Sequence, residues 1–176
     1  MAAAAERKLP RKLRGAAPAA PRFPDPPRRV LLASTGVPFT REVIARTVEL
    51  AAPEHAKITV LSIARVYGTS LGFPHPGLKP NRIELEQQKK IVHDAAKILR
   101  RKGFEVRVGL SKARNAPKMI AKWASARRFH AIVVPDPERP SWRRVVEGDL
   151  ANEIQRRCEI PVHAVPVPRT GRPGLP

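Results

Sequence analysis

The chain has 176 residues, of which 42% are hydrophobic, and its 34 Lys and Arg against 15 Asp and Glu give a formal net charge of +19. This length suits one folded domain with tails, while the single cysteine, Cys158, excludes an internal disulfide and fits a reducing, cytoplasmic setting. No apolar run approaches the ~18 residues that span a bilayer, and the charge favours a polyanionic partner over a basic surface without a specific one.

Residues 1–29 are rich in Ala, Pro and Arg, and they are predicted to be a disordered basic arm because five prolines lie between Pro18 and Pro27. The arm is interpreted as a phosphate-binding segment, with an inert linker as the alternative. An organellar transit peptide fits less well because the arm has no serine. Residues 169–176 form a short Pro/Gly tail. The basic residues of the arm are Arg7, Lys8, Arg11, Lys12, Arg14, Arg22, Arg28 and Arg29.

Between the tails, strand and helix patterns alternate. In chain order they indicate a strand at 30–33, a helix at 40–50, a strand at 58–64, a loop at 67–80, a helix at 81–102, a strand at 105–110, a helix from 115, a strand at 131–134, a helix at 150–158 and a strand at 160–165. This order predicts an α/β domain over 30–168 with a five-stranded, mainly parallel sheet and helices on both faces.

The helix patterns also predict which side chains face the core. Thr40 is expected to cap the first helix, and Asn115 is expected to open the third. Ile98 and Leu99 are expected to point inward from the second helix, and Trp123 is expected to lie on the buried face of the third.

Several segments resemble the universal stress protein family in the family's own order. They are Val30-Leu-Leu-Ala-Ser-Thr-Gly36, Val106-Arg-Val-Gly-Leu110, Ala131-Ile-Val-Val134, and Val145-Val-Glu-Gly148 running into Cys158-Glu-Ile-Pro-Val162. The resemblance covers about residues 28–168. It implies a Rossmann-like sheet, a role in stress response and, commonly, a homodimer through the last strand.

Family members that bind ATP carry a loop written G-2x-G-9x-G-(S/T) after the fourth strand and an acidic residue at the end of the first. Anchored on Gly148, the pattern places Pro135 and Glu138 on the first two glycines and Asp149 on the hydroxyl residue. Where the family usually has Asp-Gly, this chain has Thr35-Gly36. The resemblance therefore implies a degenerate nucleotide loop made of Thr35, Gly36, Pro135, Glu138, Gly148 and Asp149.

These departures predict that ATP is not a cofactor of this chain. Proline supplies no backbone N–H to a phosphate, and the carboxylates Glu138 and Asp149 repel one. Asp149 suits a helix N-cap instead. The alternative is a nucleotide site in which the arginine side chains 139, 143 and 144 replace the glycine loop.

No enzyme is predicted, because no sequence-evident nucleophile, base and oxyanion set occurs, and the five scattered histidines do not suggest a metal site. The preferred function is a non-enzymatic stress-response protein that binds RNA, a ribosome or DNA, and the alternative is a dimeric protein-binding regulatory module. The predicted polyanion-binding residues are Arg7, Lys8, Arg11, Lys12, Arg14, Lys118, Lys122, Arg127, Arg128, Arg139, Arg143 and Arg144.

Overall fold

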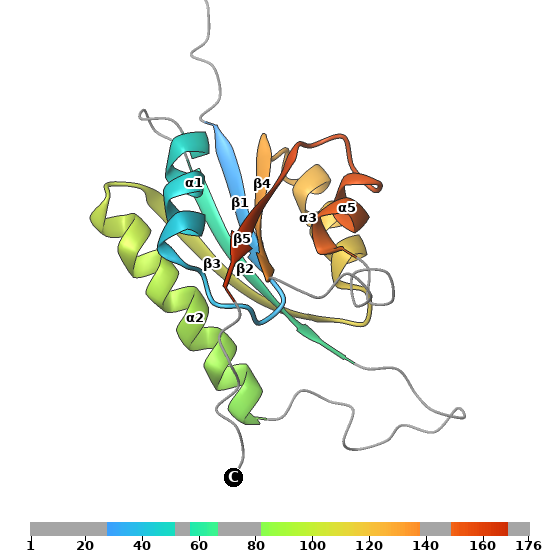
Figure 1. The fold of residues 1–176 in the computed structure, drawn as a ribbon, viewed down its shortest axis with the longest axis horizontal. Helices are drawn as coiled ribbons and strands as arrows, with labels where there is room; N and C mark the ends of the chain where they lie inside the picture. Colours follow the sequence, from blue (N-terminus) through green and yellow to red (C-terminus); the bar gives the residue numbers. More distant parts are fainter. Residues whose placement is uncertain (1–27, 52–56, 67–81, 138–148, 169–176) are drawn as a thin grey trace, which may run out of the picture.

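A computed structural model describes residues 28–51, 57–66, 82–137 and 149–168 (Figure 1). Five strands and four helices lie in this part of the chain. In order they are β1 (Arg29–Ser34), α1 (Arg41–Ala51), β2 (Lys57–Arg65), α2 (Arg82–Arg101), β3 (Glu105–Ala113), α3 (Ala116–Ala126), β4 (Ala131–Pro137), α5 (Leu150–Gln155) and β5 (Val162–Val167). The predicted loop at 67–80, the tail at 169–176 and the arm before residue 28 lie outside the described residues.

The five strands form one sheet in the order β3-β2-β1-β4-β5, and every neighbouring pair is parallel. The predicted α/β fold with a five-stranded parallel sheet is therefore confirmed. Because all strands run in one direction, their amino ends share one edge of the sheet and their carboxyl ends share the opposite edge. In Figure 1 the amino ends lie at the top and the carboxyl ends at the bottom.

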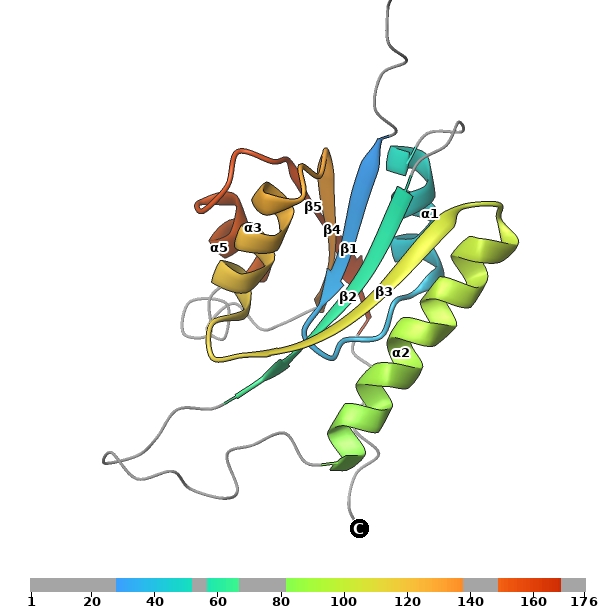
Figure 2. The ribbon, with the colours of Figure 1, turned by 180° about the vertical axis from the view of Figure 1, so that it is seen from behind.

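Helices cover both faces of the sheet, as Figure 2 shows from behind. On one face, α1 and α2 bury Val43, Ile44 and Leu99 against Leu32 and Val60. On the other, α3 and α5 pack on residues such as Leu31, Leu61 and Ile132. The central strands β1, β2 and β4 are thus apolar on both faces, which explains their continuous apolar runs.

The predicted capping side chains are found at the starts of α1 and α3. The Asn115 side chain accepts a hydrogen bond from the Lys118 N–H at 2.9 Å at the start of α3. The Thr40 hydroxyl accepts one from the Val43 N–H at 3.5 Å before α1. These side chains satisfy N–H groups that have no partner within the helix.

Several strand boundaries differ from the prediction. β3 runs on to Ala113, β5 begins at Val162, and β4 continues through Pro135, Asp136 and Pro137. The prolines predict the start of a loop, but proline is tolerated in a strand where its missing N–H has no ladder partner. β1 also begins at Arg29, so the arm predicted to reach residue 29 ends before it.

Ile98 was predicted to point into the core, and this prediction is wrong. Its side chain is 42% exposed, while its neighbour Leu99 is fully buried. The core face of α2 is formed by Val92, Ala95, Ala96 and Leu99. Ile98 instead lines a groove of about 360 Å³ between α1 and α2, together with Phe39 and Ile44. The helix is rotated relative to the prediction because alanines, rather than the larger Ile98, pack closely on the sheet.

Candidate functional site

The turn after β1 lies at the carboxyl edge of the sheet. The Ser34 hydroxyl donates to the Val37 carbonyl at 2.6 Å, and Gly36 has a φ of +93°. Only glycine adopts this conformation without strain, so Gly36 allows the chain to reverse into α1. Thr35 and Gly36, two of the predicted nucleotide-site residues, form this turn.

Gln88 of α2 reaches into the same corner. Its side-chain oxygen accepts a hydrogen bond at 3.0 Å from the hydroxyl of Ser62, the β2 residue that is paired with Ser34 at the end of β1. Its Nε2 would lie 3.4 Å from a Cβ at Gly36. A neutral amide thus fills the corner between the end of β1 and Ser62 of β2. Sequence reasoning missed Gln88, because nothing in the local pattern of α2 marks it.

Pro135 is buried within β4 rather than exposed in a loop. The Ile132 N–H donates to the Pro161 carbonyl at 3.0 Å, so the N–H positions of residues 133, 135 and 137 face β1. Pairing between β1 and β4 ends at Leu32 and Val133. Pro135 and Pro137 therefore supply no N–H at this edge of the sheet.

Asp149 caps α5, as predicted. One carboxylate oxygen accepts from the Ala151 N–H at 2.9 Å, and the other accepts from the Asn152 side-chain amide at 2.8 Å. A carboxylate is thereby fixed at the first turn of α5. The other predicted loop residues, Glu138 and Gly148, and the arginines at 139, 143 and 144 lie outside the described residues.

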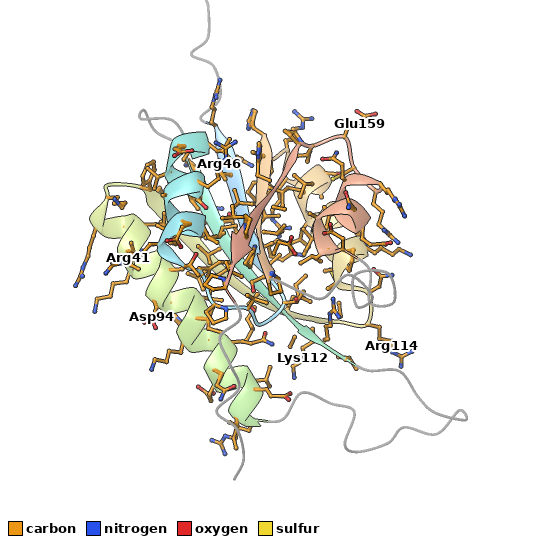
Figure 3. The ribbon with its side chains drawn as sticks, in the orientation of Figure 1. Arg41, Arg46, Asp94, Lys112, Arg114 and Glu159 are labelled. Atoms are coloured by element: carbon orange, nitrogen blue, oxygen red, sulfur yellow. The ribbon has the colours of Figure 1, made fainter. Side chains whose placement is uncertain are left out.

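A group of basic side chains comes from a stretch of the sequence that has no acidic residues. No Asp or Glu occurs between Glu105 and Asp136. The structure folds this stretch into most of β3, α3, the turn after α3 and the start of β4, and Lys112 and Arg114 lie near the turn from β3 into α3 (Figure 3). The seven basic residues of the stretch are Arg107, Lys112, Arg114, Lys118, Lys122, Arg127 and Arg128.

The predicted polyanion-binding residues on α3 are solvent-exposed. Lys118 and Lys122 stand one turn apart on the helix, and Arg127 and Arg128 follow it in the next turn. No ion pair to any of these four is found within the described residues. The predicted residues Arg7, Lys8, Arg11, Lys12 and Arg14 lie outside the described part of the chain.

At the amino edge of the sheet, basic side chains converge on a hollow of about 200 Å³, here called the amino-end hollow. Its charged walls come from Arg29 of β1, Lys57 of β2, Arg107 of β3 and the turn residue Arg127. Its remaining lining is Thr59, Val108, Trp123 and Phe129.

Glu105 is the acidic residue paired with these cations. Its carboxylate contacts the Lys57 ammonium at 2.9 Å and the Arg107 Nε at 3.9 Å. The hydrogen bond from Lys57, with the charges of Lys57, Arg107 and Arg29, lowers the pKa of Glu105 below its ordinary value. The carboxylate is therefore ionised at neutral pH and is shared among several cations.

Sequence reasoning missed Lys57 and Arg107 as site residues, and it assigned Arg29 to the basic arm rather than to the sheet. Arg29 is paired in register with Lys57, and Thr59 with Arg107, so the strand order β3-β2-β1 brings them together. Each begins or nearly begins a strand, and that position was a usable signal once the order of strands was assumed.

The family model described as "Universal stress protein family" matches residues 27–166. The chain belongs to the universal stress protein family. No curated protein sequence matches it significantly.

Solved structures of universal stress proteins share this fold. The protein from Burkholderia pseudomallei has a TM-score of 0.58 at 19% identity, covering 80% of this chain and 97% of the other. The protein from Archaeoglobus fulgidus in complex with dAMP has a TM-score of 0.55 at 17% identity, covering 78% and 95%. An Arabidopsis thaliana member with AMP bound has a TM-score of 0.51 at 12% identity, covering 80% and 92%.

Within this universal stress protein, the described residues contain no group of three or more His, Cys, Asp or Glu placed to hold a metal ion. No helix among the described ranges has the length and apolar character needed to cross a membrane. The described parts of the predicted nucleotide site are the turn at Gly36, buried Pro135 and the cap at Asp149. The basic features are the amino-end hollow and the exposed cations of β3, α3 and the turn after α3.

Proposed function

We propose that this universal stress protein is a non-enzymatic binding protein whose ligand is nucleic acid, held through its phosphates by the surface of β3 and α3. The acid-free stretch carries this proposal, since it holds seven cations and no Asp or Glu and folds mainly into β3, α3 and the turn after α3. Of these cations, Arg107 contacts the carboxylate of Glu105, which precedes the stretch. Lysine and arginine that neutralise phosphates release condensed counterions, which drives binding without reading the bases.

A simple purification experiment tests this function. Protein purified at low salt is expected to carry nucleic acid, seen as a raised ratio of absorbance at 260 nm to that at 280 nm, and a high-salt wash is expected to remove it. The salt effect follows from counterion release. A protein-binding regulatory module, the competing interpretation, carries no nucleic acid at either stage.

A second candidate function is adenine-nucleotide binding at the carboxyl edge of the sheet. It is favoured by the family relatives whose structures contain dAMP and AMP. Against it stand Pro135, which provides no N–H, and the carboxylate of Asp149, which is fixed by two hydrogen bonds. The hypothesis that arginines 139, 143 and 144 replace the glycine loop stays open beside it.

Calorimetry with Mg-ATP is expected to show weak or no binding to the unmodified chain. We expect Asp149→Ser to tighten any residual binding by roughly fivefold, because it removes one negative charge worth about 1 kcal/mol near the phosphates. Asp94→Ser, on the exposed side of α2, is the matched control and should change nothing. A micromolar dissociation constant for the unmodified chain contradicts this prediction.

We further propose that two copies pair through β5, an edge strand of the sheet. Alternation turns the N–H positions of residues 162, 164 and 166 outward. The Val162 N–H already donates to Gln155 at 2.9 Å, and Pro166 has none, so Ala164 supplies the outward donor between them.

Light scattering at high micromolar concentration is therefore expected to show a dimer that Ala164→Pro converts to a monomer. Proline is tolerated on an outward edge position, so the fold should survive, as a thermal melt would confirm. Ala164→Val keeps the N–H and should stay dimeric. A monomeric unmodified chain would refute pairing through β5.

A further inference from the structure

The amino-end hollow lies at the opposite edge of the sheet from the turn at Gly36 and the cap at Asp149. Cations from three strands and the turn after α3 surround it: Arg29, Lys57, Arg107 and Arg127. Among the described residues, the acid paired with them is Glu105, so these five side chains carry a net charge of plus three. Concave walls of one charge concentrate counter-ions more strongly than a flat surface does.

Arg127 is held in position before any ligand arrives. Its guanidinium carbon lies 3.7 Å from the centroid of the Trp123 ring. Its backbone carbonyl accepts a hydrogen bond from Nη1 of Arg29 at 3.0 Å. Stacking fixes the plane of the guanidinium while its N–H groups stay on the edge, where they can meet two oxygens of one anion.

Trp123 is in turn held against β3. A Cβ at Gly109 would lie 3.5 Å from Cη2 of the Trp123 ring and 3.2 Å from Leu61. A glycine at this position therefore lets the ring approach the strand closely. The ring supports Arg127 on one side and rests near β3 on another, so it serves as a rigid base for the guanidinium.

The size of the hollow limits what it can hold. Its volume of about 200 Å³ is below the ~300–1,000 Å³ typical of sites for drug-sized ligands. A single phosphate group, with negative charge and several acceptor oxygens, suits both this volume and the converging N–H donors.

We propose that the amino-end hollow binds a phosphate group, with Arg127 and Arg107 as hydrogen-bond donors and Lys57 and Arg29 supplying further charge. The phosphate comes from a nucleic-acid backbone or from a free phosphate compound. For the backbone source, this inference rests on the proposed function and names its phosphate-recognition point. Glu105 competes with the ligand for Lys57 and Arg107. Neutralising Glu105 is therefore expected to make the hollow bind phosphate more tightly.

The test follows the indole N–H signal of Trp123 by NMR in the full chain, with Trp142→Phe removing the other indole. Sodium phosphate replaces sodium chloride at constant ionic strength. We expect a saturable shift that Arg127→Ala weakens roughly tenfold or more, because a charge-assisted hydrogen bond is lost. Arg127→Lys keeps the charge without the planar fork and should bind at intermediate strength.

Two further variants separate the site from general charge effects. Glu105→Gln is expected to tighten phosphate binding severalfold, whereas Arg101→Ala, an exposed arginine on α2, should leave it unchanged. Both variants lie on the surface, and a melting curve checks their folding. A shift that fails to saturate, or one that Arg101→Ala and Arg127→Ala reduce equally, overturns the proposal.

A second arm uses a short single-stranded DNA oligonucleotide. If it moves the Trp123 signal in the same way, the backbone is a source of the phosphate. If the oligonucleotide binds without moving this signal, the hollow does not take backbone phosphate and the nucleic-acid function stands; if inorganic phosphate also leaves the signal unmoved, the hollow proposal is overturned. If phosphate binds the hollow and the oligonucleotide does not bind the chain, the hollow is a site for free phosphate compounds and the nucleic-acid function fails.

Discussion

A variant without the basic side chains of α3 and its following turn is expected to bind nucleic acid roughly a thousandfold more weakly at about 0.1 M salt. Each lost phosphate contact removes about 0.7–0.9 from the slope of log affinity against log salt, which is roughly five- to eightfold at this salt concentration. The measurement is fluorescence anisotropy with a labelled duplex. The four alanine substitutions are at Lys118, Lys122, Arg127 and Arg128.

The matched control removes four exposed cations from α2, on the other face of the sheet. It has the same two lysines and two arginines, and no ion pair to them is found in the described part of the chain. The control positions are Arg82, Lys90, Lys97 and Arg101. Equal loss of affinity in both variants would mean that net charge, rather than the β3 and α3 surface, determines binding.

Ile132→Ala is expected to lower the free energy of unfolding by about 2–5 kcal/mol, because the side chain is fully buried between the sheet and the helices α3 and α5. Removing it leaves a cavity in the apolar layer that supports the basic surface. The control Ile83→Ala removes the same atoms from a side chain that is 68% exposed, and should cost within about 0.5 kcal/mol. Urea denaturation measures both, and similar costs would contradict this account of the core.

The alternation of apolar strands with amphipathic helices was sufficient to predict the sheet and its helices. The helix caps at Asn115 and Asp149 were also predicted correctly, because each depends on a backbone N–H only two or three positions away. Strand ends were predicted less accurately. Proline at 135 indicated a loop, but pairing with Val165 keeps it in β4.

The candidate sites depended on contacts that the sequence pattern does not show. Gln88 meets Ser62 from 26 positions away, and Arg29 meets the carbonyl of Arg127 across 98 positions. Such contacts follow from strand order and helix rotation, which local periodicity leaves open. Lys118, Lys122, Arg127 and Arg128 were predicted because they cluster along the chain, whereas Lys57 and Arg107 join Arg29 and Arg127 only in space.

We expect this chain to bind nucleic acid by contacting the phosphates of the nucleic acid, and a salt titration measures such binding directly. Labelled RNA and duplex DNA would be titrated with the full chain and with a chain lacking residues 1–27, which spares Arg29 of the hollow. The deleted segment carries six basic and two acidic residues.

Both chains should bind at low salt with little preference for base sequence. The salt slope should be several units flatter for the shortened chain if the cations of residues 1–27 contact phosphates. Identical salt slopes for the two chains would show that residues 1–27 do not contact phosphates. Absence of binding by either chain at low salt would show that the protein does not bind nucleic acid.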